Sequence, residues 1–374
     1  MAIEPNQSAG GLAAASGLGA NGYLEFEKPL LRISQEISGL ESRQIEGSRD
    51  FSQDIRTLRN KLRGMTKRLY SNLTAWETVL VARHPRRPLI TDYIQAFVKD
   101  FFELHGDRCF GDDKAIVTGF GRIAGHKVML VGHNKGKDTR ERLACNFGCA
   151  HPEGYRKALA KMKLAAKYGV PVVCMIDTQG AYPGIGSEER GIAQAIAVNL
   201  MEMSRLPTPI VCVVIGEGGS GGALGVGVGD RVAMFEHSFY SVISPEGCAA
   251  ILWKTGEQRQ RAAESLKLTA RELKKLDIVD HIIPEPLGGA HRDPAAAAAS
   301  LEAYLGDALR DLTRFKIETL LKRRYDRIRQ IGSFFDSANK PKTVAAKRAG
   351  TSSPGRSALP AGSRLAKLET VATA

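Results

Sequence analysis

A dense run of glycines is the part of the sequence best suited to do chemistry. Five of the seven residues in Gly216–Gly222 are glycine, and they follow the apolar segment Ile210–Ile215, which predicts a buried strand. Glycine lets the backbone approach a ligand closely and adopt positive φ angles. Where such a turn leads from a strand into a helix, free backbone N–H groups point outward and can hold an anion. The structural alternative is a glycine cluster that serves only tight packing between strand and helix.

The same residues leave three chemistries open. Gly216, Gly218 and Gly221 match the G-x-G-x-x-G pattern of dinucleotide-binding turns, although no acid in a strand-end position follows about 20 residues later. Gly218, Ser220 and Gly222 match the G-x-S-x-G pattern of a hydrolase nucleophile. The acids and histidines downstream that could complete such a site are Asp277, Asp280, His281 and His291. The third chemistry is an oxyanion hole, in which paired backbone N–H groups stabilise negative charge on a bound oxygen.

A second turn of similar type is Asp177–Gly184, which follows the β-rich apolar run Val170–Ile176. Two such turns after successive strands can form two walls of one cleft. We interpret Asp177 as a helix or turn cap rather than a catalytic carboxylate. Glu217, within the first turn, is interpreted as a clamp for the loop rather than as a general base.

The elements around these turns predict a layered α/β domain, because several apolar runs are long enough to be strands buried on both faces. The predicted strands are Ala115–Phe120, Lys127–Val131, Val170–Ile176, Ile210–Ile215, Val232–Phe235, Phe239–Ile243 and Ile278–Ile283. Helices are predicted from Pro152 to Lys167, from Ser187, from Ser244-Pro245-Glu246, after a capping box of Thr269 and Glu272, and over Arg310–Gln330.

Two helices are predicted before this domain, over Leu30–Leu40 and from about Asp50. The second carries an apolar seam with alternating steps of three and four residues: Ile55, Leu58, Leu62, Met65, Leu69 and Leu73. Such a stripe needs a partner helix, which is either the first helix or another subunit.

Charge and composition divide the chain further. The net charge is +13, and the segment from Arg310 to the end holds 15 Lys and Arg against 5 Asp and Glu. The predicted organisation is a disordered leader (1–23), a helical arm (24–86), a carboxyl-terminal α/β domain with a basic terminal helix (87–330) and a basic disordered tail (331–374). Such a tail can attract phosphate-rich or acidic partners, so nucleic acid is a secondary partner class.

The chain shows no sign of a membrane, secretory or metal-binding protein. No run approaches the ~20 apolar residues of a membrane helix. The leader lacks Lys and Arg, unlike signal and transit peptides, so a cytoplasmic protein is expected. Its six cysteines lack the C-x2-C spacing of a zinc knuckle, which predicts neither a metal site nor a disulfide framework.

Seven strings, in order, resemble the alpha-subunit family of acetyl-CoA carboxylase carboxyltransferases, with the likeness running from about Leu24 to Arg329. The strings are K-G-K-D-T-R-E-R (Lys135–Arg142), N-F-G (Asn146–Gly148), P-E-G-Y-R-K-A (Pro152–Ala158), D-T-Q-G-A-Y-P-G (Asp177–Gly184), G-E-G-G-S-G-G-A-L (Gly216–Leu224), Y-S-V-I-S-P-E-G-C-A-A-I-L-W-K (Tyr240–Lys254) and I-I-P-E-P-L-G-G-A-H-R (Ile282–Arg292). Gln179 stands where the family pattern has proline.

The resemblance implies a crotonase-like fold, a spiral of β-β-α units, here with the amino-terminal helical arm and a carboxyl-terminal helix. It also implies that the amides of Gly221 and Gly222 form an oxyanion hole for the ureido oxygen of biotin, while CO2 passes from carboxybiotin to acetyl-CoA and malonyl-CoA forms. No side-chain base is then needed. The substrate-binding residues expected beside them are Gly180, Ala181, Tyr182, Gly218 and Gly219.

The resemblance further implies a subunit that works only within an assembly, catalysing the first committed step of fatty acid biosynthesis. A beta subunit with its own oxyanion hole and a four-cysteine zinc ribbon would complete an α2β2 enzyme. Biotin would arrive on a separate carboxyl carrier protein, and a separate biotin carboxylase would use ATP.

Overall fold

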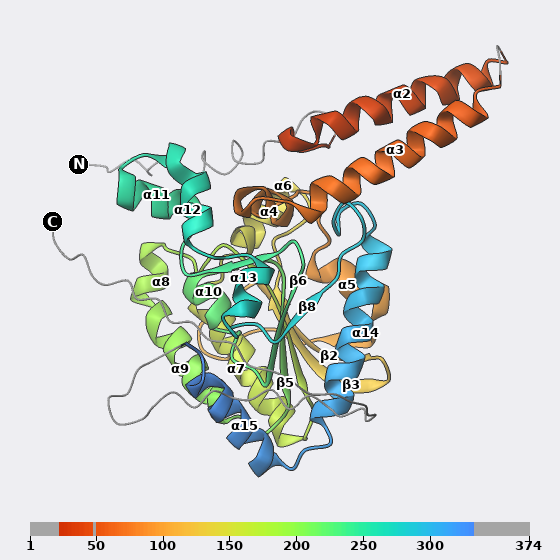
Figure 1. Ribbon diagram of the computed structural model, residues 1–374. Helices are drawn as coiled ribbons and strands as arrows, with labels where there is room; N and C mark the ends of the chain where they lie inside the picture. Colours follow the sequence, from red (N-terminus) through yellow and green to blue (C-terminus); the bar gives the residue numbers. More distant parts are fainter. Residues whose placement is uncertain (1–21, 48–49, 333–374) are drawn as a thin grey trace, which may run out of the picture. The chain divides into compact units, whose positions relative to one another are not determined.

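A mixed sheet forms the centre of the structure, a computed structural model that describes residues 22–47 and 50–332 (Figure 1). The strand order is β1-β2-β3-β4-β5-β6-β8, and β7 pairs with the far end of β5. The strands are β1 (Lys99–Glu103), β2 (Ile116–Ile123), β3 (His126–His133), β4 (Val172–Thr178), β5 (Ile210–Gly219), β6 (Arg231–Phe235), β7 (Phe239–Ser241) and β8 (His281–Ile283). The first three strands are antiparallel and the remaining pairs are parallel, so the carboxyl ends of β4 and β5 meet at one edge.

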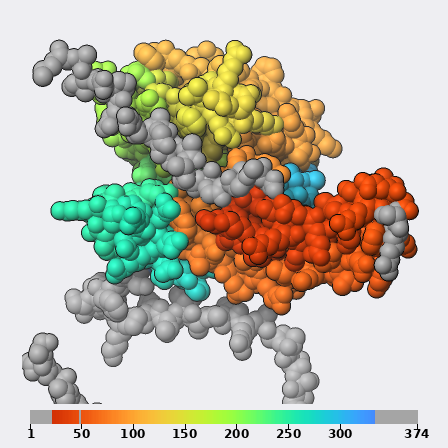
Figure 2. Space-filling model, turned by 90° about the horizontal axis from the view of Figure 1, so that it is seen from above, coloured from red at the N-terminus to blue at the C-terminus, as the bar shows by residue number. Residues whose placement is uncertain are grey.

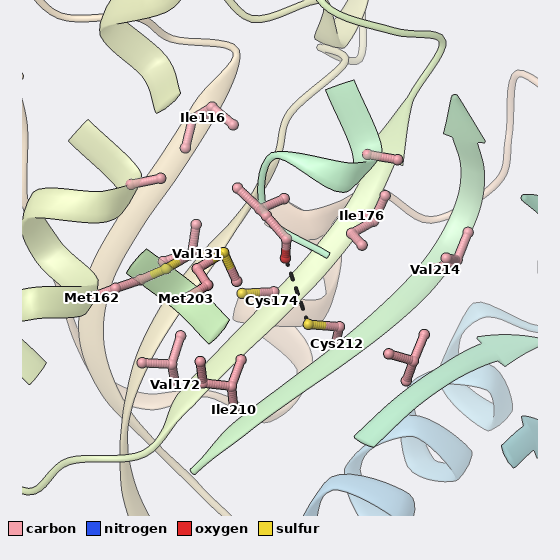
Figure 3. Close-up of a cluster of buried hydrophobic side chains, with 14 of the residues drawn as sticks. Ile116, Val131, Met162, Val172, Cys174, Ile176, Met203, Ile210, Cys212 and Val214 are labelled. Carbon is pink, nitrogen blue, oxygen red and sulfur yellow. Dashed lines mark hydrogen bonds between the residues drawn. The ribbon is translucent and has the colours of Figure 1, made fainter. Parts of the chain in front are cut away.

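The strands alternate their side chains between two apolar layers. On β4, Val172, Cys174 and Ile176 pack into the cluster shown in Figure 3, together with α7 (Pro152–Lys167) and α9 (Ile192–Arg205). Val173 and Met175 point to the opposite face, which is covered by α5 (Ile90–Phe97) and α14 (Pro294–Leu312). Because both faces are covered, the strands are apolar throughout, as the sequence predicts.

The remaining helices of the domain are mostly short. They are α6 (Thr139–Ala144), α8 (Ile185–Glu189), α10 (Ser220–Leu224), α11 (Pro245–Trp253), α12 (Arg259–Ser265), α13 (Ala270–Lys275) and α15 (Ile317–Arg329), with single 3-10 turns at Asn146–Gly148 and Gly256–Gln258. A further 3-10 turn, Glu25–Glu27, precedes the arm helices. The start of α11 is set as predicted, because the Ser244 side chain accepts a hydrogen bond from the amide of Gly247 and Pro245 occupies the first turn.

The arm is a helical hairpin of α2 (Lys28–Ile45) and α3 (Ser52–Ser71), followed by α4 (Ala75–Ala82) (Figure 1). The apolar seam of α3 packs on α2: Ile55, Leu58, Leu62 and Met65 meet Ile33, Ile37 and Leu40. The partner helix left open by the sequence is therefore α2 of the same chain. Figure 2 shows the turquoise α11–α12 segment against the red and orange arm, where α4 packs on α12.

Several predicted boundaries were wrong. The elements that were not predicted at all are β1, α4, α5, α6, α12 and α14. The helix predicted to start at Ser187 is wrong in its start, because α8 begins at Ile185 and a separate helix, α9, begins at Ile192. The predicted strand Ile278–Ile283 begins only at His281, because residues up to Asp277, which has φ 56°, still close the end of α13. The capping box of Thr269 and Glu272 is also wrong: α13 starts there, but the Thr269 side chain makes no capping hydrogen bond and Thr269 pairs with Phe239.

The predicted terminal helix Arg310–Gln330 is two helices. Arg310 belongs to the last turn of α14, and the chain turns before α15 begins at Ile317. The turn is needed because Leu309 lies in the α5 layer, whereas Arg324 on α15 binds carbonyls near the end of α9. The predicted leader and tail fall outside the described residues except for 22–23 and 331–332, and the arm boundary at residue 86 stays a prediction.

Candidate active site

The glycine turn joins β5 to α10. β5 is buried along its whole length, and α10 begins at Ser220, whose φ of 50° is uncommon for a residue other than glycine. Gly221 and Gly222 lie in the first turn of α10, where N–H groups have no acceptor within the helix. The hydrogen-bond donors that this turn offers are therefore backbone amides.

The turn after β4 packs directly against the glycine turn. A Cβ atom on Gly222 would lie 2.6 Å from the amide nitrogen of Ala181 and 2.8 Å from the Cα of Gly180. One on Gly219 would lie 2.9 Å from the Cα of Gln179. Real Cβ atoms do not approach heavy atoms this closely, so only glycine fits at both positions. The structure thus brings Gly180 and Ala181 together with the glycine turn.

The other predicted site residues line the same region with different surroundings. A Cβ on Gly218 would lie 2.7 Å from the Tyr240 ring, whereas one on Gly221 would have the Ile196 side chain at 3.5 Å as its nearest neighbour. The Tyr182 amide donates to the carbonyl of Ala150 at 3.0 Å, and its ring lies 4.2 Å from that of His151. Gly221 is consequently the open position of the turn.

A cluster of buried charges lies beneath the turn. Glu217 accepts a hydrogen bond from Arg83 Nε at 2.6 Å, and its other carboxylate oxygen pairs with Lys135. Arg83 also bonds Glu246 at 2.6 Å, and Lys135 Nζ lies 2.7 Å from Asp177 Oδ1. Burial by itself would raise the pKa of Glu217, but Lys135 and Arg83 outweigh it and lower that pKa to about 2.

Glu217 is therefore the loop clamp that the sequence predicts. A carboxylate with so low a pKa, with both oxygens already bonded to cations, is poorly suited to accept a proton near neutral pH. The interpretation of Asp177 as a turn cap is wrong, because its carboxylate accepts from the Glu217 amide at 2.9 Å and pairs with Lys135.

The rear of the turn is supported by three buried side chains. The Tyr155 hydroxyl donates to the carbonyl of Gly222 at 3.4 Å, and the Asn199 amide group donates to the carbonyls of Tyr155 and Gly225 at 3.0 and 2.9 Å. His133 is close to the same Gly222 carbonyl; burial lowers the pKa of His133 to about 3, with Lys135 acting in the same direction. The ring is therefore neutral at physiological pH.

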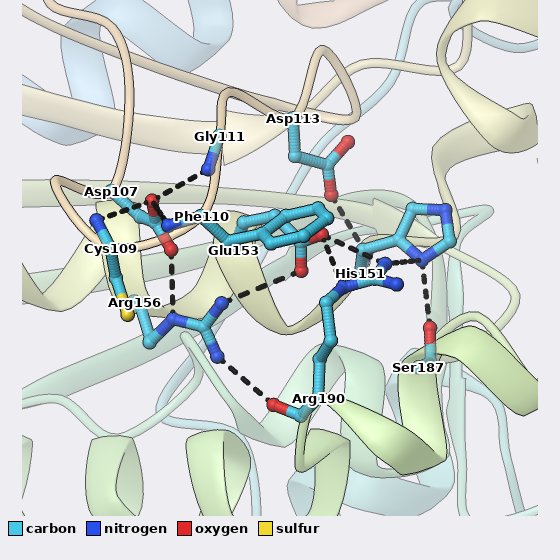
Figure 4. Close-up of polar contacts among 10 residues, drawn as sticks. All are labelled: Asp107, Cys109, Phe110, Gly111, Asp113, His151, Glu153, Arg156, Ser187 and Arg190. Carbon is cyan, nitrogen blue, oxygen red and sulfur yellow. Dashed lines mark hydrogen bonds and ion pairs between the residues drawn. The ribbon is translucent and has the colours of Figure 1, made fainter.

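The second turn leads into α8, which a polar network holds (Figure 4). Arg190 Nε donates to Glu153 at 2.8 Å, and Arg156 donates to the carbonyl of Arg190 at 3.1 Å. His151 Nδ1 lies 2.7 Å from the Ser187 hydroxyl. These contacts anchor the wall that Ala181 and Tyr182 begin.

Two of the chemistries left open by the sequence do not fit this geometry. In the described part of the chain, no hydrogen bond joins Ser220 to a histidine or an acid. His281 stacks on Tyr304, and His291 stacks on His84 at 3.8 Å. A hydrolase triad is therefore absent from these residues, and the five-residue α10 is shorter than the helix of a dinucleotide-binding unit.

Sequence reasoning missed the cations that hold the turn. Lys135 stands in the string K-G-K-D-T-R-E-R, which carried the family resemblance, but no local pattern connects it to Glu217, 82 residues later. Arg83 lies within the predicted arm, and no local pattern in the sequence indicates that its side chain, or those of His133 and Asn199, support the turn. The roles of these side chains depend on contacts between residues far apart in the sequence, and sequence spacing does not predict such contacts.

The described residues contain no metal-binding cluster, no membrane-spanning helix and no disulfide. Over 22–47 and 50–332, no group of three or more His, Cys, Asp or Glu side chains is arranged to hold a metal ion. No helix in these ranges is long and apolar enough to cross a membrane. The cysteines are free thiols, and Cys109 alone among the six is exposed.

Comparison with known proteins identifies the family of the chain. Residues 23–332 match the family described as acetyl co-enzyme A carboxylase carboxyltransferase-like. The acetyl-coenzyme A carboxylase carboxyl transferase subunit alpha of Rhodopirellula baltica is 51% identical over 315 residues, covering 84% of this chain and 98% of the relative. The protein of the same name from Chromobacterium violaceum is 51% identical over 316 residues, with the same coverage of both chains.

Among solved structures, the fold resembles transcarboxylase 12S, with a TM-score of 0.51 and 20% identity. The match covers 62% of this chain and 43% of that one, and it bears on the fold alone. It confirms the α/β, crotonase-like fold that the sequence predicts. By the family match over residues 23–332 and the identity to these relatives, the chain belongs to the acetyl-CoA carboxylase carboxyltransferase family, as a transferase subunit of the alpha type.

Proposed function

We propose that the glycine turn is the alpha-subunit half of a carboxyltransferase site that moves a carboxyl group from carboxybiotin to acetyl-CoA, giving malonyl-CoA for fatty acid biosynthesis. One observation carries the proposal. Gly221 and Gly222 place adjacent amides at the start of α10, in a turn that a second glycine turn contacts and whose carboxylate, Glu217, is paired with Arg83 and Lys135.

The chain acts on developing negative charge through hydrogen bonds. Amides held in place before the reaction need not reorganise as charge grows on a bound oxygen, and each such donor is worth about 3–4 kcal/mol of barrier reduction. Gly221 is the open position of the turn, because a Cβ there would have the Ile196 side chain at 3.5 Å as its nearest neighbour, and this leaves room for a ureido oxygen. Gly180, Ala181, Tyr182, Gly218 and Gly219 would border the substrate.

Carboxybiotin, carried on a separate carrier protein, supplies the carboxyl group. We propose that a separate biotin carboxylase uses the ATP, so this chain needs neither an ATP site nor a biotinylated lysine. A cytoplasmic location for the assembly is part of the same proposal.

We propose that a beta subunit completes the site in an α2β2 assembly. Large apolar side chains are exposed where the turns end: Ile185 follows the second turn and is 80% exposed, and Val242 is 73% exposed. Val242 follows Ser241, which pairs with Gly219. Exposed apolar side chains gathered near a site are typical of a surface that another protein covers.

The test compares two substitutions at one position. Gly221→Pro removes the amide donor, whereas Gly221→Ala keeps it and meets no atom closer than 3.5 Å. Both variants are purified with the beta-type partner and assayed for malonyl-CoA formation. We expect Gly221→Pro to lose at least about 100-fold in kcat and Gly221→Ala to stay within about fivefold of wild type.

Co-purification with the partner is the control for assembly. Equal activity of the proline variant and wild type would contradict the oxyanion-hole proposal. An isolated, active monomer would contradict the shared site.

A further inference from the structure

The sheet ladder is interrupted where β5 approaches the glycine turn. Ile176 on β4 pairs with Val214, but Thr178 pairs with Gly218, so two steps along β4 correspond to four along β5. Within this irregular stretch, the Glu217 amide donates to Asp177 Oδ1 at 2.9 Å instead of to a strand carbonyl. A side-chain carboxylate thus takes the place of a strand carbonyl in this irregular stretch, and a strand with such an irregularity bends there.

This arrangement places two buried carboxylates next to each other. The side chains of Asp177 and Glu217 are 5% and 2% exposed. Asp177 also occupies the space in which a Cβ on Gly216 would lie, 2.6 Å from Oδ1. Like charges this close and this poorly hydrated repel strongly unless a cation lies between them.

Lys135 is that cation. It follows β3 in the chain, and its Nζ lies 2.7 Å from Asp177 Oδ1 while also pairing with Glu217. Arg83 bonds the far side of Glu217 but has no ion pair with Asp177. Among the described ion pairs, Lys135 alone bridges the two carboxylates.

We infer that Lys135 is a positioning residue for the carboxyltransferase reaction: by bridging Asp177 and Glu217 it fixes the bend of β5 and thereby the direction of the Gly221 and Gly222 amides. The inference rests on the proposed function of the turn and adds to it the residue that sets its geometry. Lys135 acts through the two carboxylates and is not assigned a contact with substrate.

Removal of the ammonium should make the site sensitive to pH. Without Lys135, two adjacent carboxylates compete for the remaining cation, and acid would relieve the repulsion by protonating one of them. Among the described residues, the other charged or titratable groups that interact with this cluster are Arg83, Arg87, Tyr93, His133, Cys149 and Glu246. None of them bridges the two carboxylates in the way Lys135 does.

The experiment uses the complex of this chain with its beta-type partner and measures biotin-dependent decarboxylation of malonyl-CoA between pH 6 and pH 9. Lys135→Met should lower kcat about 100-fold at pH 8 with KM for malonyl-CoA within about threefold, because the donors are misdirected while the substrate surface remains. The loss should shrink toward pH 6, and wild type should show no such acid recovery.

A compensating variant tests the bridge itself. Lys135→Met/Asp177→Asn removes one charge of each sign. The side-chain oxygen introduced at position 177 can still accept from the Glu217 N–H, and the side-chain NH2 can donate to the Glu217 carboxylate. We expect it to recover at least about tenfold of the lost kcat and to lose the dependence on acid. Lys163→Met is the matched control, since Lys163 pairs with Glu202 at 2.7 Å on the surface of α7.

The outcomes separate the possibilities. A Lys135→Met kcat within threefold of wild type, or a loss confined to KM, would overturn the inference. So would a double variant that fails to assemble or is no more active than the single one. If Lys135→Met does not assemble, the double variant alone decides. An inactive wild-type complex would instead overturn the proposed function, and this inference with it.

Discussion

Gly222 and Ala181 are in backbone contact, since a Cβ atom on Gly222 would lie 2.6 Å from the Ala181 amide nitrogen. The two residues belong to turns that follow neighbouring parallel strands, β5 and β4. The contact means that neither turn can move without displacing the other. The direction of the amides in α10 is thus linked to the wall formed by the second turn.

Gly222→Ala should cost far more activity than Gly221→Ala. The added methyl group at 222 must push the Gly180–Ala181 backbone or α10 aside, whereas the same group at 221 has room. A displacement approaching 1 Å at a catalytic donor lowers kcat by about 100-fold. Steady-state kinetics of the two alanine variants in the assembled enzyme provide the measurement, and equal kcat values would refute the packing argument.

Ser220→Ala should leave kcat within about threefold of wild type. Ser220 has no histidine or acid partner among the described residues, so its hydroxyl is not activated as a nucleophile. The assay is malonyl-CoA formation by the complex. A loss of 10⁴-fold or more, the scale seen when a true serine nucleophile is removed, would revive the hydrolase interpretation.

The stability of the protein should fall as the pH falls from about 6.5 to about 4, in part because of His84. His84 is 3% exposed and its ring stacks on that of His291, and burial lowers the pKa of His84 to about 4. In the unfolded chain the His84 ring binds a proton below about pH 6.5, whereas in the folded chain it does so only below about pH 4. Between these pH values acid therefore favours the unfolded chain.

His84→Asn should reduce this acid sensitivity, because asparagine does not titrate and its side-chain oxygen can still accept from the Arg86 amide, as His84 Nδ1 does at 3.1 Å. Urea unfolding at pH 7 and pH 4.5 should show a drop in the free energy of unfolding that is about 2 kcal/mol smaller than in wild type. The exposed His105→Asn is the control. Identical drops in wild type and His84→Asn would show that this ring does not contribute.

Arg324→Met should destabilise the fold by about 3–5 kcal/mol. The guanidinium is fully buried and donates to Asp230 and to three carbonyls, those of Met203, Leu206 and Thr208, at 2.6–2.9 Å. The substitution leaves a buried carboxylate without its cation. The free energy of unfolding in urea measures the loss, and Arg323→Met, at the adjacent exposed position, should change it by less than about 1 kcal/mol. Similar values for both variants would contradict the importance of the buried pair.

Much of the architecture follows from local sequence pattern. Apolar runs identify β3 to β6, and the seam on α3 identifies a helix that needs a partner. The start of α11 at Ser244-Pro245 can also be predicted from the sequence, because its capping contacts join residues no more than three positions apart. α14 carried a comparable signal, since the Asp293 side chain caps it and Pro294 begins it, and it could have been predicted.

The sequence by itself identified the glycine run between a buried strand and a short helix as a candidate source of backbone donors, and the order of the family strings indicated one enzyme family, which the family match confirms. Only the tertiary structure decided what holds those donors in place. Lys135 reaches Glu217 across 82 residues, and Arg83 reaches it across 134. Ionic contacts of this kind depend on where the sheet brings strand ends together, and a charged residue in a loop has the same local pattern whether it is buried in a pair or exposed to water.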